Sequence, residues 1–162
     1  MKTTGNTILI TGGGSGIGEA LAHRFHDLGN TVIIAGRRQE MLERAAAGRE
    51  NMHAMSVDVE SNADIVNFAN RVIKQYPNIN VLINNAGIMR SEVLDGQRDL
   101  ADAEAMITTN LLGTMRMTNA FIDHFVEQHD TTIVNVSSGL AFVPLFSAPT
   151  YNATKAAIHS YT

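Results

Sequence analysis

The sequence has no cysteine, and its 6 histidines are scattered along 162 residues. The absence of cysteine excludes a disulfide framework and a thiolate metal site. None of the histidines occurs in a paired metal-ligand spacing, so we expect no metal site. Only 3 prolines are present, and they fall between the predicted elements rather than inside them.

An excess of basic residues and long apolar runs are also missing. The net charge is −4, which gives no global electrostatic reason to bind nucleic acid or an anionic membrane. No apolar stretch reaches the roughly 18 residues that a membrane-spanning helix needs, and the N-terminal apolar run is too short for a signal peptide. We therefore expect a cytoplasmic protein with neither a nucleic-acid nor a membrane partner.

Short apolar runs alternate with segments of helical length. The runs rich in β-branched residues are 6–11, 31–35, 52–59, 80–84 and 131–136. The helical segments are 15–28, 38–49, 60–75 and 100–128. Strands that are apolar throughout are typical of a parallel sheet covered on both faces. The alternation predicts an α/β fold of right-handed βαβ units, a doubly wound parallel sheet.

The length predicts one domain over residues 1–162. Segment 100–128 is apolar on more than one side, and one sheet cannot cover so wide a face. We therefore expect a homodimer or homotetramer, formed through this helix and the helix that begins at Tyr151.

A glycine-rich turn, "ILITGGGSGIG", follows the first strand and opens a helix, with the spacing Gly12-x-x-x-Gly16-x-Gly18. Backbone without side chains lets a pyrophosphate approach amides at a helix N-terminus, where the dipole favours an anion. A simple turn is the alternative. The residues expected to bind a dinucleotide here are Gly12, Gly14, Ser15, Gly16, Ile17 and Gly18.

The second strand ends in "VIIAGRRQE", with Gly36 where dinucleotide folds commonly place a ribose-binding carboxylate. A guanidinium of Arg37 or Arg38 can pair with a ribose 2′-phosphate, and no carboxylate is expected to oppose it. This favours NADP(H), with NAD(H) possible. The alternative, two surface arginines capping a loop, is strongest for Arg38.

Tyr151 and Lys155 lie one helical turn apart, so their side chains leave the same face of a helix. Interconverting a carbonyl and an alcohol needs a group that trades a proton with the substrate oxygen. The Lys155 ammonium would favour the phenolate form of Tyr151. Ser138 ends the fifth strand and can bond the substrate oxygen, and strand alternation sends Ser137 and Ser138 to opposite faces. Alone, Tyr-x-x-x-Lys is more often an ordinary helical pair.

Together "TGGGSGIG", "NNAG" at 84–87, Ser138 and "YNATK" resemble the classical short-chain dehydrogenase/reductase family. The resemblance implies a Rossmann-type fold with strand order 3-2-1-4-5, a nicotinamide cofactor, and hydride transfer between it and a secondary alcohol or ketone. The N-terminal half is similar to a subgroup encoded beside teichoic-acid D-alanylation genes.

The resemblance also implies roles for further residues. Ser138 matches the family's serine, Lys155 would also bind the nicotinamide ribose, and Asn110 would hold a water for proton relay. A polar residue in an apolar helix can instead kink it or bond a backbone carbonyl, which is the alternative for Asn110. The remaining cofactor positions are Asp58 at the adenine amino group, Val59 beside its ring, and Asn84, Asn85, Ala86 and Gly87 in the wall beneath the cofactor. For the "NNAG" segment, a tight strand-end turn is the alternative.

Family members are longer and have further C-terminal strands. The sequence stops inside the helix that begins at Tyr151, without a helix stop signal, and the strand at 131–136 would be an unpaired edge. We therefore expect a C-terminally truncated domain that binds NADP(H) weakly and turns over poorly.

Met89, Phe142 and Phe146 are expected to line the substrate pocket, which hints at an apolar small molecule. The leading interpretation is an NADP(H)-dependent oxidoreductase acting on a carbonyl or alcohol. The alternative is a catalytically silent nucleotide-binding module that senses redox state or serves as a scaffold.

Overall fold

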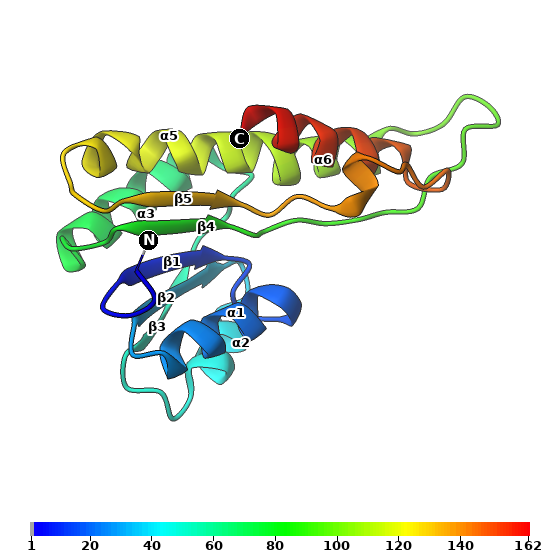
Figure 1. The fold of residues 1–162 in the computed structure, drawn as a ribbon. Helices are drawn as coiled ribbons and strands as arrows, with labels where there is room; N and C mark the ends of the chain where they lie inside the picture. The colour runs from blue at the N-terminus through cyan, green and yellow to red at the C-terminus, as the bar shows by residue number, and fades with distance from the viewer. Residues whose placement is uncertain (1) are drawn as a thin grey trace.

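The computed structural model describes residues 2–162 and contains a 5-stranded parallel sheet in the order β3-β2-β1-β4-β5 (Figure 1). The strands are β1 (Thr7–Thr11), β2 (Thr31–Gly36), β3 (Met52–Ser56), β4 (Val81–Asn84) and β5 (Thr132–Asn135). The chain starts at the central strand, moves outward through β2 and β3, and returns to add β4 and β5 on the other side. This confirms the predicted doubly wound sheet and its strand order.

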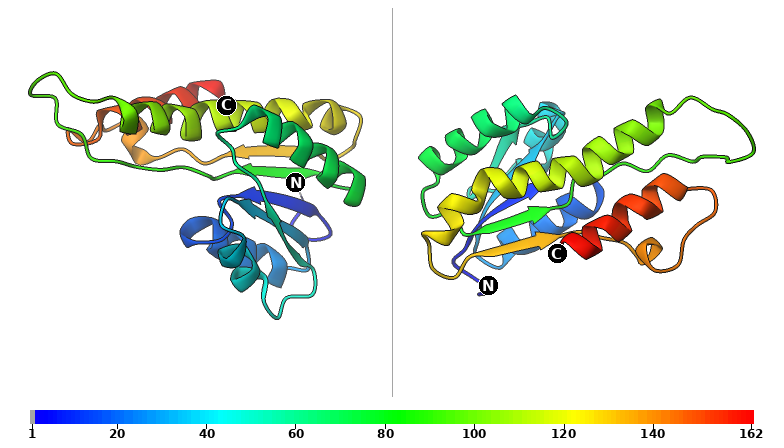
Figure 2. Two further views of the ribbon diagram at one scale, coloured as in Figure 1. Left: turned by 180° about the vertical axis from the view of Figure 1, so that it is seen from behind. Right: turned by 90° about the horizontal axis from the view of Figure 1, so that it is seen from above.

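Helices cover both faces of the sheet (Figure 2). They are α1 (Gly16–Asp27), α2 (Gln39–Ala46), α3 (Asn62–Gln75), α4 (Ala101–Met106), α5 (Gly113–Val126) and α6 (Pro149–Tyr161), with a π-helix η1 (Ile107–Leu112) and a 3-10 turn η2 (Gly139–Ala141). α1 and α2 pack on one face, and α3 and α5 pack on the other. α6 lies against η1, η2 and α4, beyond the β5 edge.

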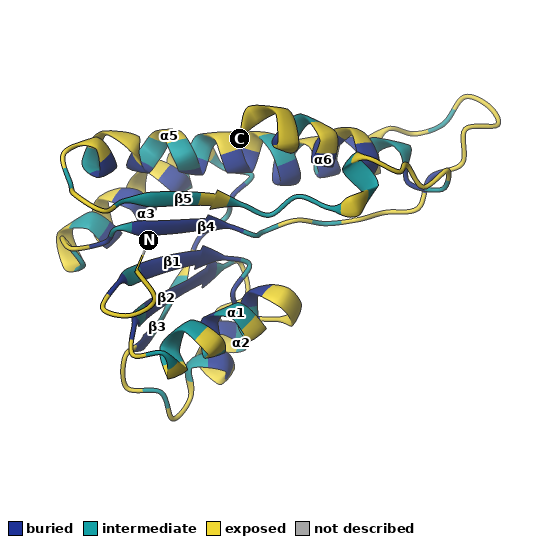
Figure 3. Ribbon diagram, in the orientation of Figure 1, coloured by how far each residue is buried: buried dark blue, intermediate teal, exposed yellow. Residues whose placement is uncertain are grey.

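Two apolar clusters, one on each face, form the core. Along β1, Leu9 belongs to the cluster under α3 and α5, whereas Ile8 and Ile10 belong to the cluster under α1 and α2. All three side chains are fully buried, as strand alternation inside a two-sided sheet requires. The inner strands are buried except at Thr7, Thr31 and Gly36, which are partly exposed, and the outer strands β3 and β5 are only partly covered (Figure 3).

The predicted helical segments 15–28 and 60–75 agree with α1 and α3 to within two residues. Ser61 caps α3, because its hydroxyl accepts a hydrogen bond from the amide of Asp64 at 3.2 Å. Ser15 occupies the N-cap position of α1 but makes no capping bond. The predicted segment 38–49 is too long, since α2 ends at Ala46.

The helix predicted over 100–128 is found as one helical stretch from Ala101 to Val126, but its middle turn, η1, is π-helical rather than α-helical. Asn110, at 1% exposure, lies in this turn. Its Oδ1 accepts a hydrogen bond from the Ile88 amide at 2.8 Å, and its Nδ2 donates to the Ile88 carbonyl at 2.9 Å and to Thr154 Oγ1 at 3.2 Å. Wide turns of this kind are frequent at functional sites. Here the turn connects the loop after β4 with α6.

The outer side of this helical stretch is rich in apolar residues. Those that are exposed are Ile107, Leu112, Met115, Ile122 and Val126. The subunit contact expected here stays a prediction. Among residues 2–162, no helix combines the length and the apolar character needed to cross a membrane.

Phe121 should be a strong stability determinant, since it is fully buried between α5 and the sheet. We expect Phe121→Ala to lower the free energy of unfolding by about 3–5 kcal/mol, through lost burial and the cavity left behind. Val126→Ala is the matched control, because Val126 on the same helix is 73% exposed. Chemical denaturation measures both, and equal losses would contradict the packing described.

Candidate active site

A cavity of about 770 Å³ opens at the carboxyl edge of the sheet. Its walls come from the loops that follow all five strands and from α6. The residues singled out from the sequence that line it are Gly12, Gly14, Ser15, Ile17, Arg37, Arg38, Val59, Asn85, Ala86, Gly87, Met89, Tyr151 and Lys155. Residues up to 143 positions apart in the chain therefore meet at one site, from Gly12 to Lys155.

The glycine loop lies close against its neighbours. The amides of Gly12 and Gly13 donate to the carbonyl of Ala35 at 2.7 and 3.2 Å, which folds the loop over the end of β2. Gly12 has a positive φ of 69°. A Cβ at Gly18 would overlap the Gly12 carbonyl oxygen and the Asn85 side chain. Gly16 and Gly18 do not line the cavity themselves, so Gly18 serves the close packing of loop and helix.

Thr11 and Asn85 join the ends of β1 and β4. Thr11 Oγ1 accepts hydrogen bonds from the amides of Asn85 and Ala86, each at 3.0 Å. Asn85 Nδ2 donates back to the Thr11 carbonyl at 3.0 Å. Sequence reasoning missed Thr11, because a threonine ending a strand is unremarkable until its partner strand is known.

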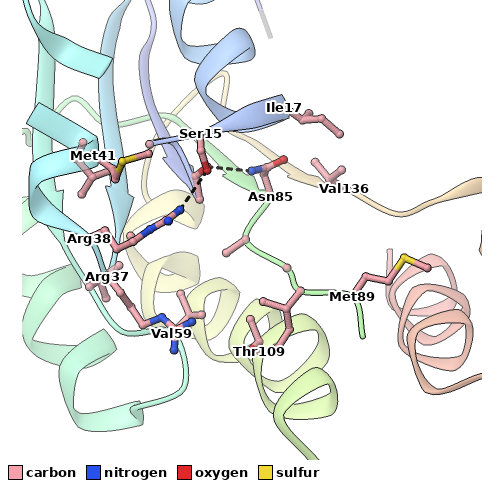
Figure 4. Close-up of a pocket in the computed structure, with 18 of the residues that line it drawn as sticks. Ser15, Ile17, Arg37, Arg38, Met41, Val59, Asn85, Met89, Thr109 and Val136 are labelled. Carbon is pink, nitrogen blue, oxygen red and sulfur yellow. Dashed lines mark hydrogen bonds between the residues drawn. The ribbon is translucent and has the colours of Figure 1, made fainter. Parts of the chain in front are cut away.

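The two arginines after β2 have different surroundings. Arg37 Nη1 lies 3.1 Å from Glu60 Oε1, which also accepts a hydrogen bond from Thr109 Oγ1 at 2.8 Å. The expectation that no carboxylate opposes these arginines is therefore wrong for Arg37, because Glu60 approaches from the loop before α3. Arg38 Nη2 points to Ser15 Oγ at 3.4 Å, across the glycine loop (Figure 4). Within residues 2–162, Arg38 forms no ion pair.

Tyr151 and Lys155 line the cavity together from α6. Lys155 is 5% exposed, and its Nζ lies 5.7 Å from the centroid of the Tyr151 ring. Nζ donates to the carbonyl of Val136 at 2.7 Å, and burial lowers the pKa of Lys155. A Cβ at Gly87 would lie 3.6 Å from this Nζ, so the ammonium faces the backbone after β4.

The two serines after β5 have distinct partners. Ser137 lines the cavity, and its hydroxyl donates to the Lys155 carbonyl at 2.9 Å. Ser138 does not line it and caps η2, since its Oγ accepts from the Leu140 amide at 3.1 Å. β5 ends at Asn135, so strand alternation does not distinguish these serines. The role of Ser138 therefore rests on the family pattern alone.

Three further predicted cofactor or relay positions lie behind the cavity wall. Asp58 accepts a hydrogen bond from the Glu60 amide at 3.0 Å, and its neighbours Val57 and Val59 line the cavity whereas Asp58 does not. Buried Asn84 donates to Thr118 Oγ1 at 3.1 Å and to Asn135 Oδ1 at 2.9 Å. Asn110 makes the backbone contact that the alternative interpretation expected, through its bond to the Ile88 carbonyl.

The predicted apolar lining is found only in part. Met89 lies beside α6 at the cavity (Figure 4). Phe142 and Phe146 are 65% and 86% exposed and do not line it. The lining residues to which sequence reasoning gave no role in the site are Gly36, Met41, Leu42, Val57, Ile88, Arg90, Thr109, Val136 and Ser137. Some follow strands and others lie in helices, and nothing local distinguishes them from their neighbours.

Comparison with known proteins agrees with this geometry. A curated relative, the uncharacterized oxidoreductase DltE of Bacillus subtilis, is 42% identical over the whole chain, which spans 65% of the length of that protein. This confirms the closer resemblance seen in the N-terminal half. The solved structure of a serine dehydrogenase complexed with NADP+ has a TM-score of 0.90 at 32% identity, covering 96% of this chain and 63% of that one.

A second solved structure is similar to the same degree. The 3-ketoacyl-(acyl-carrier-protein) reductase from Brucella melitensis, complexed with NADH, has a TM-score of 0.92 at 30% identity, covering 99% of this chain and 69% of that one. The family model for short chain dehydrogenases matches residues 6–162. The chain therefore belongs to the short chain dehydrogenase family.

Proposed function

We propose that this protein is an NADP(H)-dependent oxidoreductase that transfers hydride between the cofactor and a secondary alcohol or ketone. The observation that supports this most is that Tyr151 and Lys155 line the same cavity as the glycine loop. A binding-only module has no need of a phenol and an ammonium at the far end of a nucleotide cleft.

The residues present fit a dinucleotide. The cavity volume of about 770 Å³ lies within the range of roughly 300–1,000 Å³ that is usual for ligand sites. Gly12, Gly14 and Ser15 would bind the pyrophosphate. Gly12 and Gly14 have no side chains that could keep the phosphates away from the backbone amides. Val59 would lie against the adenine, and Ala86 and Gly87 would form the wall towards the nicotinamide.

The bound cofactor supplies or accepts the hydride, and the chain's own residues manage the proton. In the reductive direction, Tyr151 donates its hydroxyl proton to the substrate oxygen. Lys155 Nζ donates one N–H group to the Val136 carbonyl, and this hydrogen bond fixes the ammonium beside Tyr151. Its other N–H groups remain available for the ribose hydroxyls. By the family pattern, Ser138 would orient the substrate oxygen, and Asn110 would hold a relay water.

Arg38 is the residue on which the NADP(H) preference depends. It reaches across the glycine loop to Ser15, so a ribose 2′-phosphate entering there would meet a guanidinium and a hydroxyl. Arg37 is partly neutralised by Glu60. The resemblance to a serine dehydrogenase bound to NADP+ supports this preference, and that to a reductase bound to NADH leaves NAD(H) as the alternative.

Tyr151→Phe should abolish turnover and leave cofactor binding intact. The phenol is the proton donor, whereas the dinucleotide contacts come mainly from other residues. We expect kcat to fall by about 10²–10⁴-fold in NADPH oxidation with a carbonyl panel, with an unchanged Kd in NADPH fluorescence titration. The silent module would instead be favoured by a full-length protein that binds NADPH and turns over no carbonyl compound.

Arg38→Ala should weaken NADPH binding by about 10–100-fold, because a charge-assisted bond to the 2′-phosphate contributes about 1.5–3 kcal/mol. NADH binding should change little. Parallel fluorescence titrations with both cofactors measure the ratio. Equal losses for NADPH and NADH would show that Arg38 supports the loop rather than the phosphate.

Glu60→Gln should act in the opposite direction. Removing the carboxylate charge frees Arg37 for the phosphate, and because the pair is partly exposed, we expect a gain in NADPH affinity of less than about fivefold. NADH affinity is the internal control. A loss of NADPH affinity in this variant would mean that Glu60 orders Arg37 for binding.

A further inference from the structure

Glu92, in the loop between β4 and α4, has a buried carboxylate that no step above uses. Its side chain is 1% exposed. Three donors converge on it: Arg98 Nη1 at 2.6 Å, the Thr150 amide at 2.8 Å and Thr150 Oγ1 at 2.8 Å. Its own amide donates to the Ser147 carbonyl at 2.8 Å. Burying a carboxylate is costly unless it is paired and bonded in this way.

The contacts place Glu92 at the start of α6. Ala148, at the N-cap position of α6, has no side chain that could accept a hydrogen bond. The first amides of a helix lack intrahelical partners, and a negative charge near them is favourable. The Glu92 carboxylate supplies both the acceptor and the charge from a distant loop. The residue that follows Thr150 is Tyr151.

Glu92 also belongs to the loop that forms one wall of the cavity. Gly87, Ile88 and Met89 line the cavity just before it, and Asn110 holds Ile88 from the other side. Two anchors therefore join this loop to α6: Asn110 through Thr154, and Glu92 through Thr150. Thr150, bound by Glu92, precedes Tyr151 on the helix, and Thr154, bound by Asn110, follows it.

We propose that Glu92 is a positioning residue that fixes the first turn of α6 against the loop after β4, so that the Tyr151 hydroxyl is held at the reacting end of the cavity. This inference rests on the proposed function. Arg98 balances the buried charge and keeps the carboxylate ionised. Glu92 itself touches neither substrate nor cofactor. It affects the position of Tyr151 through its hydrogen bonds with Thr150, the preceding residue.

The electrostatics agree with this role. Burial alone raises the pKa of Glu92, but the hydrogen bonds from Thr150 and the Arg98 guanidinium more than offset this, and the pKa lies below its ordinary value. The carboxylate therefore stays charged at neutral pH and can accept from all three donors.

Glu92→Gln is the sharpest test. The amide keeps the shape of the side chain, but its NH2 group would face a donor and it offers one acceptor oxygen instead of two. We expect kcat to fall at least about tenfold, as small misplacements of reacting groups do, with Kd for NADPH within twofold of wild type. Hydrogen exchange of the unliganded protein should be faster at the amides of residues 150–154.

A second pair of variants separates positioning from general damage. Thr150→Val removes the hydroxyl and should lower kcat in the same way, whereas Thr150→Ser keeps the hydroxyl and should restore it. Glu104→Gln, at an exposed position on α4, is the matched control and should match wild type in every readout.

Wild-type kcat in Glu92→Gln, or an equal loss of kcat and NADPH affinity, would overturn the proposal. If the full-length wild type turns over no carbonyl substrate, the proposed function fails, and hydrogen exchange still decides the positioning claim. Unchanged exchange at residues 150–154 in Glu92→Gln would then overturn it.

Discussion

All five strands of the sheet run in the same direction, and the position of the candidate site follows from this. Because every strand runs the same way, the loop after each one emerges at the same edge, which is where ligands bind in doubly wound sheets. The cavity, the glycine loop and the Thr11–Asn85 bonds all lie at this edge. β1 and β4, neighbours in the sheet, meet there to make the centre of the site.

α6 brings Tyr151 and Lys155 to this edge, and several long-range contacts hold the helix in place. Lys155 Nζ donates a hydrogen bond to the carbonyl of Val136, just after β5. The carbonyl of Lys155 accepts a hydrogen bond from the Ser137 hydroxyl. The buried ammonium is costly to desolvate, which its lowered pKa reflects. Packing alone does not account for a lysine at this position, because an apolar side chain would pack there without the cost of burying a charge. The proposed function would account for it, since it requires an ammonium held beside Tyr151.

The fold followed from the sequence because its signals are local. Runs such as "TILIT" and "TVIIAG" are apolar throughout, and the glycine turn directly follows the first of them. The strands were predicted within a few residues of their bounds. The π-helical turn was missed because its explanation, the bonding of Asn110 to Ile88, lies outside the helix itself.

Site residues that belong to a local sequence pattern could be predicted, whereas contacts between distant loops could not. Tyr151 and Lys155 were found through helical spacing, which is a local property. The Glu60 partner of Arg37 and the contacts of Glu92 with Arg98 and Thr150 were not, since they depend on loops that meet only after folding. Side-chain exposure in the loop after β5 also escaped prediction, because Phe142 and Phe146 look like lining residues and face outward.

In the proposed function, one dinucleotide spans the cavity from Arg38 to Tyr151. A crystal structure of the protein with NADP+ would show whether the cofactor binds in this way. We predict the 2′-phosphate within hydrogen-bonding distance of the Arg38 guanidinium, and the nicotinamide ring in front of the Tyr151 hydroxyl. A cofactor bound outside this cavity, or a Tyr151 hydroxyl turned away from the nicotinamide, would contradict the account.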